Sequence, residues 1–128
     1  MTGFSANIED KTKENNNFRK VLFTGKYCQL VVMSLLPGED IGEEVHDKVD
    51  QFFRFEDGKG KVVMNGEETE VEEEMVVIVP AGTLHNILNT SADKPLKLYT
   101  IYSPPNHPDG TVHATKAEAV AAEVGHDN

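Results

Sequence analysis

Short segments separated by regular turn signals fill this sequence between residues 18 and 103. A break rich in Gly, Pro or Asn follows every six to twelve residues, and the intervening segments are rich in apolar residues. Such spacing is typical of antiparallel sandwiches and barrels. Asn65-Gly66, between two such segments, is the strongest short signal for a two-residue hairpin turn. The sequence therefore predicts an all-β fold of antiparallel strands.

About nine strands are expected, and helical periodicity occurs only near the end of the chain. The strands cover residues 18–23, 27–36, 43–47, 50–56, 61–64, 67–72, 75–79, 84–89 and 96–102. Residues 27–36 are nearly all apolar, which indicates a strand that is covered on both faces.

The chain divides into three parts. Residues 1–17 are expected to form a loose polar arm with a short strand near residues 4–8, and residues 18–103 form the barrel. Residues 104–128 form a Pro-rich loop and a short helix. The helix opens with a capping box from Thr115 to Glu118 and is expected to end at Gly125.

Composition excludes several classes of partner. The 128 residues include 22 acidic and 12 basic ones, which gives a formal net charge of −10. A chain so negative is repelled by nucleic acid and by anionic membrane surfaces. The apolar runs are too short to cross a bilayer, and the polar first residues lack the apolar core of a secretory signal. We therefore expect a cytoplasmic protein without nucleic-acid or membrane partners.

Two smaller features also give predictions. The single cysteine, Cys28, excludes an intrachain disulfide, and its apolar surroundings predict a small buried hydrophobe. Six Glu residues lie between residues 67 and 74. They indicate a solvated hairpin rim that discourages edge pairing, rather than a cation-binding patch.

Four polar side chains are spaced as a metal site requires. Glu44 and His46 are two residues apart, so on a strand they leave the same face. Gln51 follows a polar stretch that can hold a turn, and His85 follows a bend at residues 80–84. Together they offer a carboxylate, two imidazoles and an amide oxygen for a divalent metal. The alternative is that both histidines are satisfied core residues in a barrel that binds no metal.

The same residues carry a resemblance to the cupin superfamily. Its first motif begins with a Gly, continues with two ligand residues that are separated by one residue, and ends with a third ligand residue and a second Gly. The matching residues here are Gly38, Glu44, His46, Gln51 and Gly58. Its second motif is matched by Pro80, Gly82, His85 and Asn89. Three residues depart from the pattern: Glu44 stands in place of His, Gln51 in place of Glu, and Glu74 in place of Gly. The first two exchange the position of one carboxylate and leave the formal charge of the ligand set unchanged.

The resemblance implies an antiparallel double-stranded β-helix, a jelly-roll-like barrel that holds one divalent transition metal. Fe, Mn, Ni, Co and Zn all suit the four ligands. It also implies a small-molecule ligand and a homodimer, since an open barrel has sheet edges to cover. The chain resembles the small single-domain cupins described as mannose-6-phosphate isomerase-like.

Aromatic residues are expected beside the metal. If Gln51 points inward, alternation also points Phe53 and Phe55 inward, as pocket wall or as plain core. Tyr99 and Tyr102 face opposite ways, so at most one of them lines the pocket.

Other polar residues have weaker signals. His107 and His113 lie in the Pro-rich segment and are expected in a surface loop rather than in the ligand set. Arg19 and Lys20 are candidate contacts for an anion.

Three functions fit this set of residues. The first is a metal-dependent enzyme on a small oxygenated metabolite, such as a sugar, sugar phosphate or keto acid, with isomerase-like Lewis-acid chemistry. The second is a non-haem Fe(II) dioxygenase, which two imidazoles and one carboxylate suit. The third is a non-catalytic module that holds a small ligand through the metal.

Overall fold

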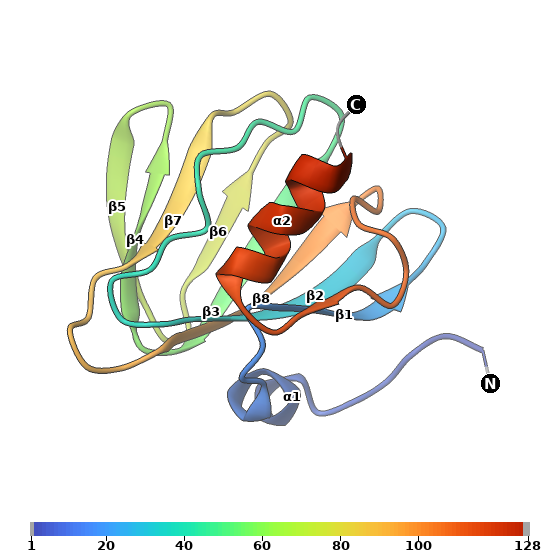
Figure 1. Ribbon diagram of the computed structural model, residues 1–128, viewed down its shortest axis with the longest axis horizontal. Helices are drawn as coiled ribbons and strands as arrows, with labels where there is room; N and C mark the ends of the chain where they lie inside the picture. Colours follow the sequence, from blue (N-terminus) through green and yellow to red (C-terminus); the bar gives the residue numbers. More distant parts are fainter. Residues whose placement is uncertain (1, 127–128) are drawn as a thin grey trace.

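Nine strands and two helices make up the computed structural model, which describes residues 2–126 and the side chains up to residue 123 (Figure 1). In chain order they are α1 Ile8–Glu14, β1 Arg19–Thr24, β2 Gln29–Leu35, β3 Asp50–Asp57, β4 Lys59–Met64, β5 Glu67–Glu72, β6 Val76–Val79, β7 His85–Asn89, β8 Leu96–Ser103, β9 Val112–His113 and α2 Lys116–His126. Neither helix has the length and apolar content needed to cross a membrane.

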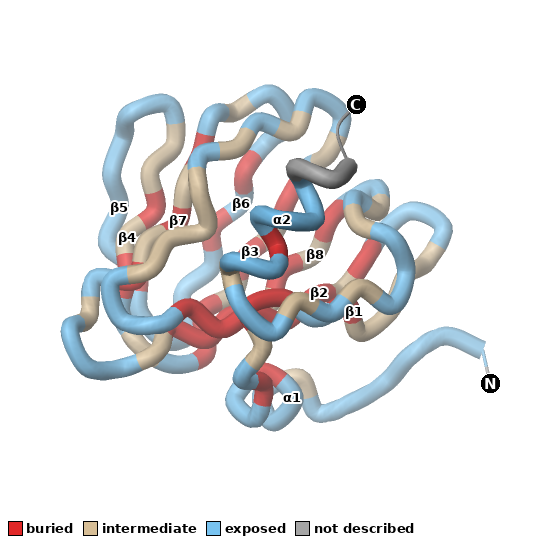
Figure 2. Tube along the Cα trace, in the orientation of Figure 1, coloured by how far each residue is buried: buried red, intermediate tan, exposed pale blue. Residues whose placement is uncertain are grey.

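The strands form two sheets that face each other across one core. The larger sheet has the order β6-β3-β8-β2-β1-β9 and the smaller has the order β5-β4-β7, and the paired strands are antiparallel. The buried segments of both sheets line the space between them (Figure 2). The predicted antiparallel β-helix barrel with a short C-terminal helix is therefore confirmed.

Strand β2 runs through the middle of the larger sheet and is buried on both faces. Val31, Val32 and Met33 are at most 1% exposed. Val31 and Met33 belong to the core between the sheets, whereas Val32 lies on the outer side, where α1 packs. The apolar run in the sequence predicted this double burial correctly.

Helix α1 corrects the expectation of a loose arm with a strand near residues 4–8. Asn7 caps the helix, because its side chain accepts a hydrogen bond of 3.0 Å from the Asp10 amide. An ion pair between Glu9 and Lys13 supports it one turn apart. Buried Lys97 of β8 donates to the Asn15 carbonyl, so this segment is attached to the barrel. The polar composition of this segment gave no indication of the helix.

Residues 43–47 also differ from expectation, since they form no strand. Glu44 makes a single antiparallel bridge with His85, and Asp40 makes another with Leu88. Gly42 between them has φ +105°, which breaks the extended run. The other eight expected strands are present, and the short β9 pairs with β1 in a region expected to be loop.

Cys28 is exposed, which contradicts its predicted burial. Strand β2 begins one residue later, at Gln29, so Cys28 lies in the turn after β1. The Gly25 amide donates to its carbonyl across that turn. A turn position has no core to face, whatever the polarity of its neighbours.

Helix α2 lies across the open end of the barrel, between the two sheets (Figure 1). Its start matches the predicted capping box, because Thr115 accepts from the Glu118 amide and Glu118 accepts from the Ala114 amide. Lys116 pairs with Asp40, and Ala119 is buried against the core cluster. Gly125 lies within the helix and does not end it.

Candidate metal centre

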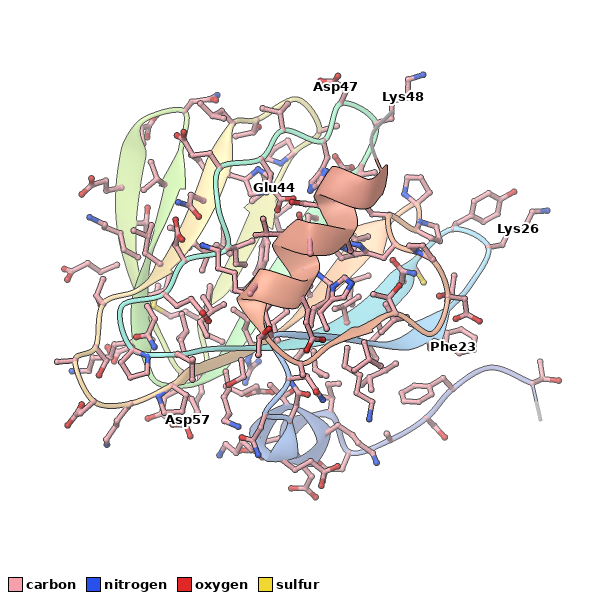
Figure 3. The ribbon with its side chains drawn as sticks, in the orientation of Figure 1. Phe23, Lys26, Glu44, Asp47, Lys48 and Asp57 are labelled. Atoms are coloured by element: carbon pink, nitrogen blue, oxygen red, sulfur yellow. The ribbon has the colours of Figure 1, made fainter. Side chains whose placement is uncertain are left out.

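Three ligand side chains come together inside the barrel mouth. Glu44, His46 and His85 each offer one atom, and these atoms all lie within 4.8 Å of one another. The Nε2 of His46 is 3.9 Å from a carboxylate oxygen of Glu44. Glu44 lies on the side of the barrel that α2 covers, while Asp47 and Lys48 point into solvent (Figure 3).

Backbone hydrogen bonds hold the two parts of this group together. The Glu44 amide donates to the His85 carbonyl at 2.9 Å, and the His85 amide donates to the Glu44 carbonyl at 3.0 Å. Residues paired in this way place their side chains on the same face. The Gly82 amide also donates to the His46 carbonyl, at 2.9 Å. Residues 44–46 are thereby aligned with the bend before β7.

The hydrogen bond of His85 decides which ring nitrogen is free. Its Nδ1 lies 2.9 Å from the Thr83 carbonyl, which only accepts, so Nδ1 carries the proton. Nε2 then carries a lone pair, and it is buried without a partner among the described residues. The same holds for the Nε2 of His46. For His85 this is the state in which imidazole binds metal, with the second nitrogen oriented by a carbonyl.

Gln51 points into the barrel from β3. Its side-chain Nε2 donates to the Thr100 hydroxyl at 3.0 Å, and its Oε1 is buried without a partner among the described residues. Buried polar atoms are rarely left unpaired, because each costs about 1–3 kcal/mol. Unpaired acceptors on two imidazoles and one amide fit a metal ion that binds N and O ligands.

Burial sets the charge state of the group. It raises the pKa of Glu44, and the nearby Arg19 guanidinium opposes that effect. Burial lowers the pKa of His46, and the neighbouring His85 and Arg19 lower it further. A neutral imidazole is therefore favoured at position 46, as metal binding requires.

Tyr102 and His107 lie next to the ligands. The Tyr102 ring meets His46 edge-on at 6.0 Å between centroids, and its hydroxyl is 3.2 Å from His107 Nε2. Burial raises the pKa of Tyr102 to about 12 and lowers that of His107 to about 3. His107 was expected in a surface loop, and the structure corrects this.

Gln29 explains the position of His107. This fully buried side chain accepts from the amides of Asn106 and His107 and donates to the His107 carbonyl. It draws the loop onto the barrel. A lone Gln at the start of an apolar strand is the sequence signal that could have indicated this contact.

The expected aromatic wall is present in part. Phe53 meets the His85 ring at 6.4 Å between centroids, and Phe55 lies in the core cluster. Tyr102 lies opposite Gln51 in the β3–β8 ladder, on the inner face. Tyr99 faces outward and packs on Phe52, so it does not line the space beside the ligand group.

Arg19 and Lys20 of β1 also point to opposite faces of the sheet. Lys20 is exposed, whereas Arg19 points inward and is only 3% exposed. Opposite Arg19 in β9 lies His113, which is half-buried. Of the two candidate anion contacts, Arg19 alone reaches the interior.

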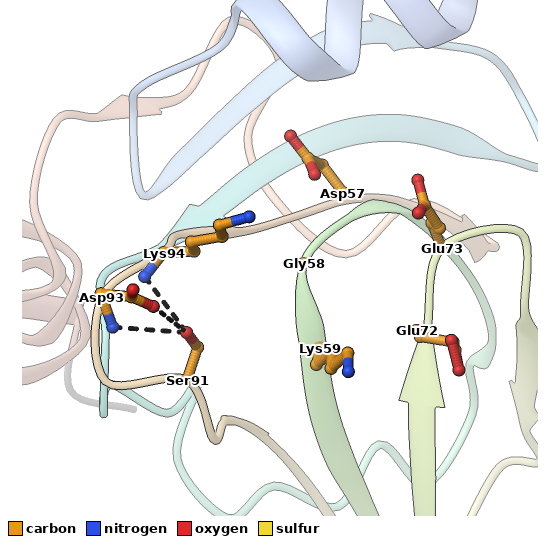
Figure 4. Close-up of a pocket in the computed structure, with 8 residues that line it drawn as sticks. All are labelled: Asp57, Gly58, Lys59, Glu72, Glu73, Ser91, Asp93 and Lys94. Atoms are coloured by element: carbon orange, nitrogen blue, oxygen red, sulfur yellow. Dashed lines mark hydrogen bonds between the residues drawn. The ribbon is translucent and has the colours of Figure 1, made fainter.

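Two hollows in the structure have the size of a small-molecule binding site. One, of about 180 Å³, lies beneath α2 and is lined in part by Arg19, His107 and His113. The other, of about 330 Å³, lies far along the barrel and is lined by residues such as Asp57, Lys59 and Ser91 (Figure 4). Ser91 donates to Asp93 there, and none of the buried unpartnered atoms of the described residues lines this hollow. The first hollow is connected to the ligand group through His107, which contacts Tyr102, whose ring in turn meets His46.

Residues 31–102 match the protein family described as Cupin domain. The chain belongs to the cupin family. It is 54% identical over 126 residues to the uncharacterized protein YrkC of Bacillus subtilis, with 94% of this chain and 67% of YrkC covered. It is 38% identical over 120 residues to the uncharacterized protein L612 of Acanthamoeba polyphaga mimivirus, with 91% and 74% covered.

Solved structures agree with this assignment. The crystal structure of BH2720 from Bacillus halodurans is 50% identical to this cupin and superposes with a TM-score of 0.89, covering 92% of this chain and 93% of that one. A predicted oxalate decarboxylase of Thermotoga maritima shares the fold at 22% identity, with a TM-score of 0.58 and coverage of 62% and 69%.

The remaining motif residues of this cupin shape its backbone. Gly58 has φ +94°, and a Cβ there would lie 2.5 Å from the Pro95 carbonyl. Asn89 is buried and donates to the carbonyls of Leu35 and Lys94, so it fixes a loop and not the metal centre. Glu74 keeps the left-handed conformation of the glycine it replaces, with φ +74°.

Proposed function

We propose that this cupin is a metal-dependent enzyme acting on a small oxygenated metabolite, with Glu44, His46, Gln51 and His85 as metal ligands. The observation that carries the proposal is the set of unpartnered acceptors on His46, His85 and Gln51, buried beside the Glu44 carboxylate. A sugar, a sugar phosphate or a keto acid belongs to the substrate class. The mannose-6-phosphate isomerase-like cupins are the group whose chemistry is proposed.

A divalent metal in this position supplies a Lewis acid for adjacent carbonyl and hydroxyl oxygens. The protein supplies the rest. Phe53 and the barrel wall exclude water beside His85. The Tyr102 phenol keeps its proton at neutral pH, because burial raises its pKa to about 12. Held next to His107, this hydroxyl is the group that donates a proton to a substrate oxygen.

A non-haem Fe(II) dioxygenase is the second candidate. The specific observation in its favour is the cluster of two imidazoles and one carboxylate, Glu44, His46 and His85, which suits Fe(II). Under this candidate, Phe53 contacts an apolar substrate. A non-catalytic module that holds its ligand through the metal is the third.

Elemental analysis of the purified, untagged protein tests the proposal. We expect near-stoichiometric metal in the native protein, loss of the metal in a His46→Ala/His85→Ala double variant, and retention in His113→Ala. Iron with oxygen consumption would favour the dioxygenase, whereas Mn, Zn, Co or Ni would favour Lewis-acid chemistry. Absence of metal in every sample, even after incubation with divalent ions, would refute a metal enzyme.

A further inference from the structure

Arg19 is a buried cation that forms no ion pair with the residues the structure describes. The residue is 3% exposed, and its Nε has no hydrogen-bond partner within the described part of the chain. None of the ion pairs among the described residues includes it. The guanidinium lies over the Phe18 ring at 5.3 Å and close to the Tyr102 hydroxyl. A buried charge without a partner is costly, so its retention calls for a reason.

The guanidinium lies near the ligand group and lines a cavity. Its positive charge lowers the pKa of Glu44, His46, His107 and His113. The cavity of about 180 Å³ lies beneath α2. Its lining includes Arg19, His107 and His113, together with Ala119, Ala122 and Glu123 of the helix. That volume equals about six water molecules, so the space suits a compound of few heavy atoms.

The charges around the cavity specify the ligand further. With a divalent ion bound, the ion and Arg19 would carry three positive charges, against one negative charge on Glu44 and one on Glu123 at the cavity wall. The site would then keep one positive charge in excess, which a monoanion would balance. Guanidinium binds planar carboxylate through two parallel hydrogen bonds.

We infer that Arg19 binds the carboxylate of a small 2-hydroxy or 2-oxo acid in this cavity, with the neighbouring oxygen of the acid toward the metal centre. The inference rests on the proposed function and narrows its substrate class. Sugars without a carboxylate leave Arg19 unpaired. Arg19 is a specificity-determining residue in this reading, and it moves no proton.

Titration calorimetry with glycolate tests the inference on protein carrying the metal found by elemental analysis. Glycolamide is the neutral probe of nearly equal shape, and inorganic phosphate is the alternative anion. Arg19→Met is the main variant, and Lys20→Met is its control, since the adjacent Lys20 has the same charge but points into solvent. The metal content of every sample is measured, so loss of the metal is distinguished from loss of the acid.

We expect Arg19→Met to weaken glycolate binding at least about 30-fold, and Lys20→Met to change it less than about twofold because exposed charges contribute little. Glu123→Gln should tighten it, because it removes a competing negative charge. Native protein should bind glycolamide and phosphate more weakly than glycolate. The melting temperature of Arg19→Met without ligand should equal or exceed that of native protein, because an unpaired buried charge has been removed.

Unchanged glycolate binding in metal-loaded Arg19→Met would overturn the inference and leave the proposed function intact. Arg19-dependent binding of phosphate in preference to glycolate would overturn the choice of carboxylate. A large fall in melting temperature would indicate a structural role for Arg19. Arg19→Lys then distinguishes the two roles, because it keeps the positive charge but cannot form two parallel hydrogen bonds with a carboxylate. The inference would be refuted if folded Arg19→Lys bound glycolate with native affinity and Glu123→Gln had no effect on glycolate binding.

Discussion

Glu44 and His85 face each other across a single antiparallel bridge, and each amide donates to the carbonyl of the other. Backbone hydrogen bonds therefore join two motifs that are far apart in the sequence. The distance between the carboxylate and the imidazole depends on this bridge more than on side-chain packing. Removing either side chain should leave the bridge, so metal-ligand variants are expected to fold.

Glu44→Gln should stabilise the metal-free protein while removing the stabilisation that metal provides. Burial raises the folded-state pKa of Glu44, so the folded protein binds more protons than the unfolded chain. Stability from this group is therefore lost as pH rises from about 4.5 through the raised pKa. Above that pH range the ionised, buried Glu44 destabilises the folded protein, and the neutral Gln side chain does not. Urea unfolding at pH 7, with chelator and with metal, measures both effects, and equal metal stabilisation in both proteins would contradict the ligand role.

Gln51→Ala should weaken metal binding about tenfold, the lower end of the effect of removing a supporting group. A neutral amide oxygen is a poorer ligand than a carboxylate, so Glu44→Ala should cost more. Competition with a chromophoric chelator gives both affinities. His113→Ala serves as control, and an equal loss in the Gln51 and Glu44 variants would contradict the weaker contribution expected of the amide.

His107 should make the protein sensitive to acid. Its folded-state pKa is about 3, well below the unfolded value of 6.5, because it is buried and faces Arg19, His113 and His46. The unfolded chain therefore takes up a proton first, and stability falls as pH drops from 6.5 toward 3, by up to about 1.4 kcal/mol per pH unit.

His107→Gln should flatten that decline between pH 6.5 and pH 4. Urea unfolding of metal-free protein at several pH values gives the slope for each variant. His113→Gln should alter the slope less, because His113 is more exposed. Parallel curves for native protein and His107→Gln would show that His107 does not titrate in this way.

Glu74→Gly should stabilise the protein by about 0.5–1 kcal/mol. Glu74 adopts φ +74°, which costs a non-glycine residue roughly 1–2 kcal/mol. Glycine avoids this cost, but it loses more backbone entropy on folding, which offsets part of the stabilisation. Glu73→Gly, one residue earlier, should instead destabilise it by about 0.5–1 kcal/mol. The urea midpoints of the two variants should move in opposite directions, and a shift in the same direction would contradict the argument.

Much of this fold could be predicted because apolar alternation and turn residues are local signals. Eight of the strands followed from them, and motif spacing brought Glu44, His46 and His85 together. The strand at residues 43–47 was wrong, because two motif residues need only one bridge, not a ladder. Alternation left Tyr99 and Tyr102 equivalent, and only the register against Gln51 separates them.

Long-range contacts explain the other failures. Helix α1 depends on the Asn7 cap and on attachment through Lys97, and neither appears in hydrophobic periodicity. His107 reaches Tyr102 because Gln29 binds a loop 78 residues later in the chain. The homodimer and the cytoplasmic location stay predictions.

Cys28 lies exposed in a turn, so each molecule carries one accessible thiol. Two copies that meet under oxidising conditions are able to form a disulfide without any native interface. A dimer seen by chromatography is therefore ambiguous until reductant is added or Cys28→Ser is compared. The same thiol lies outside the ligand group and offers one position for a spin label or fluorophore.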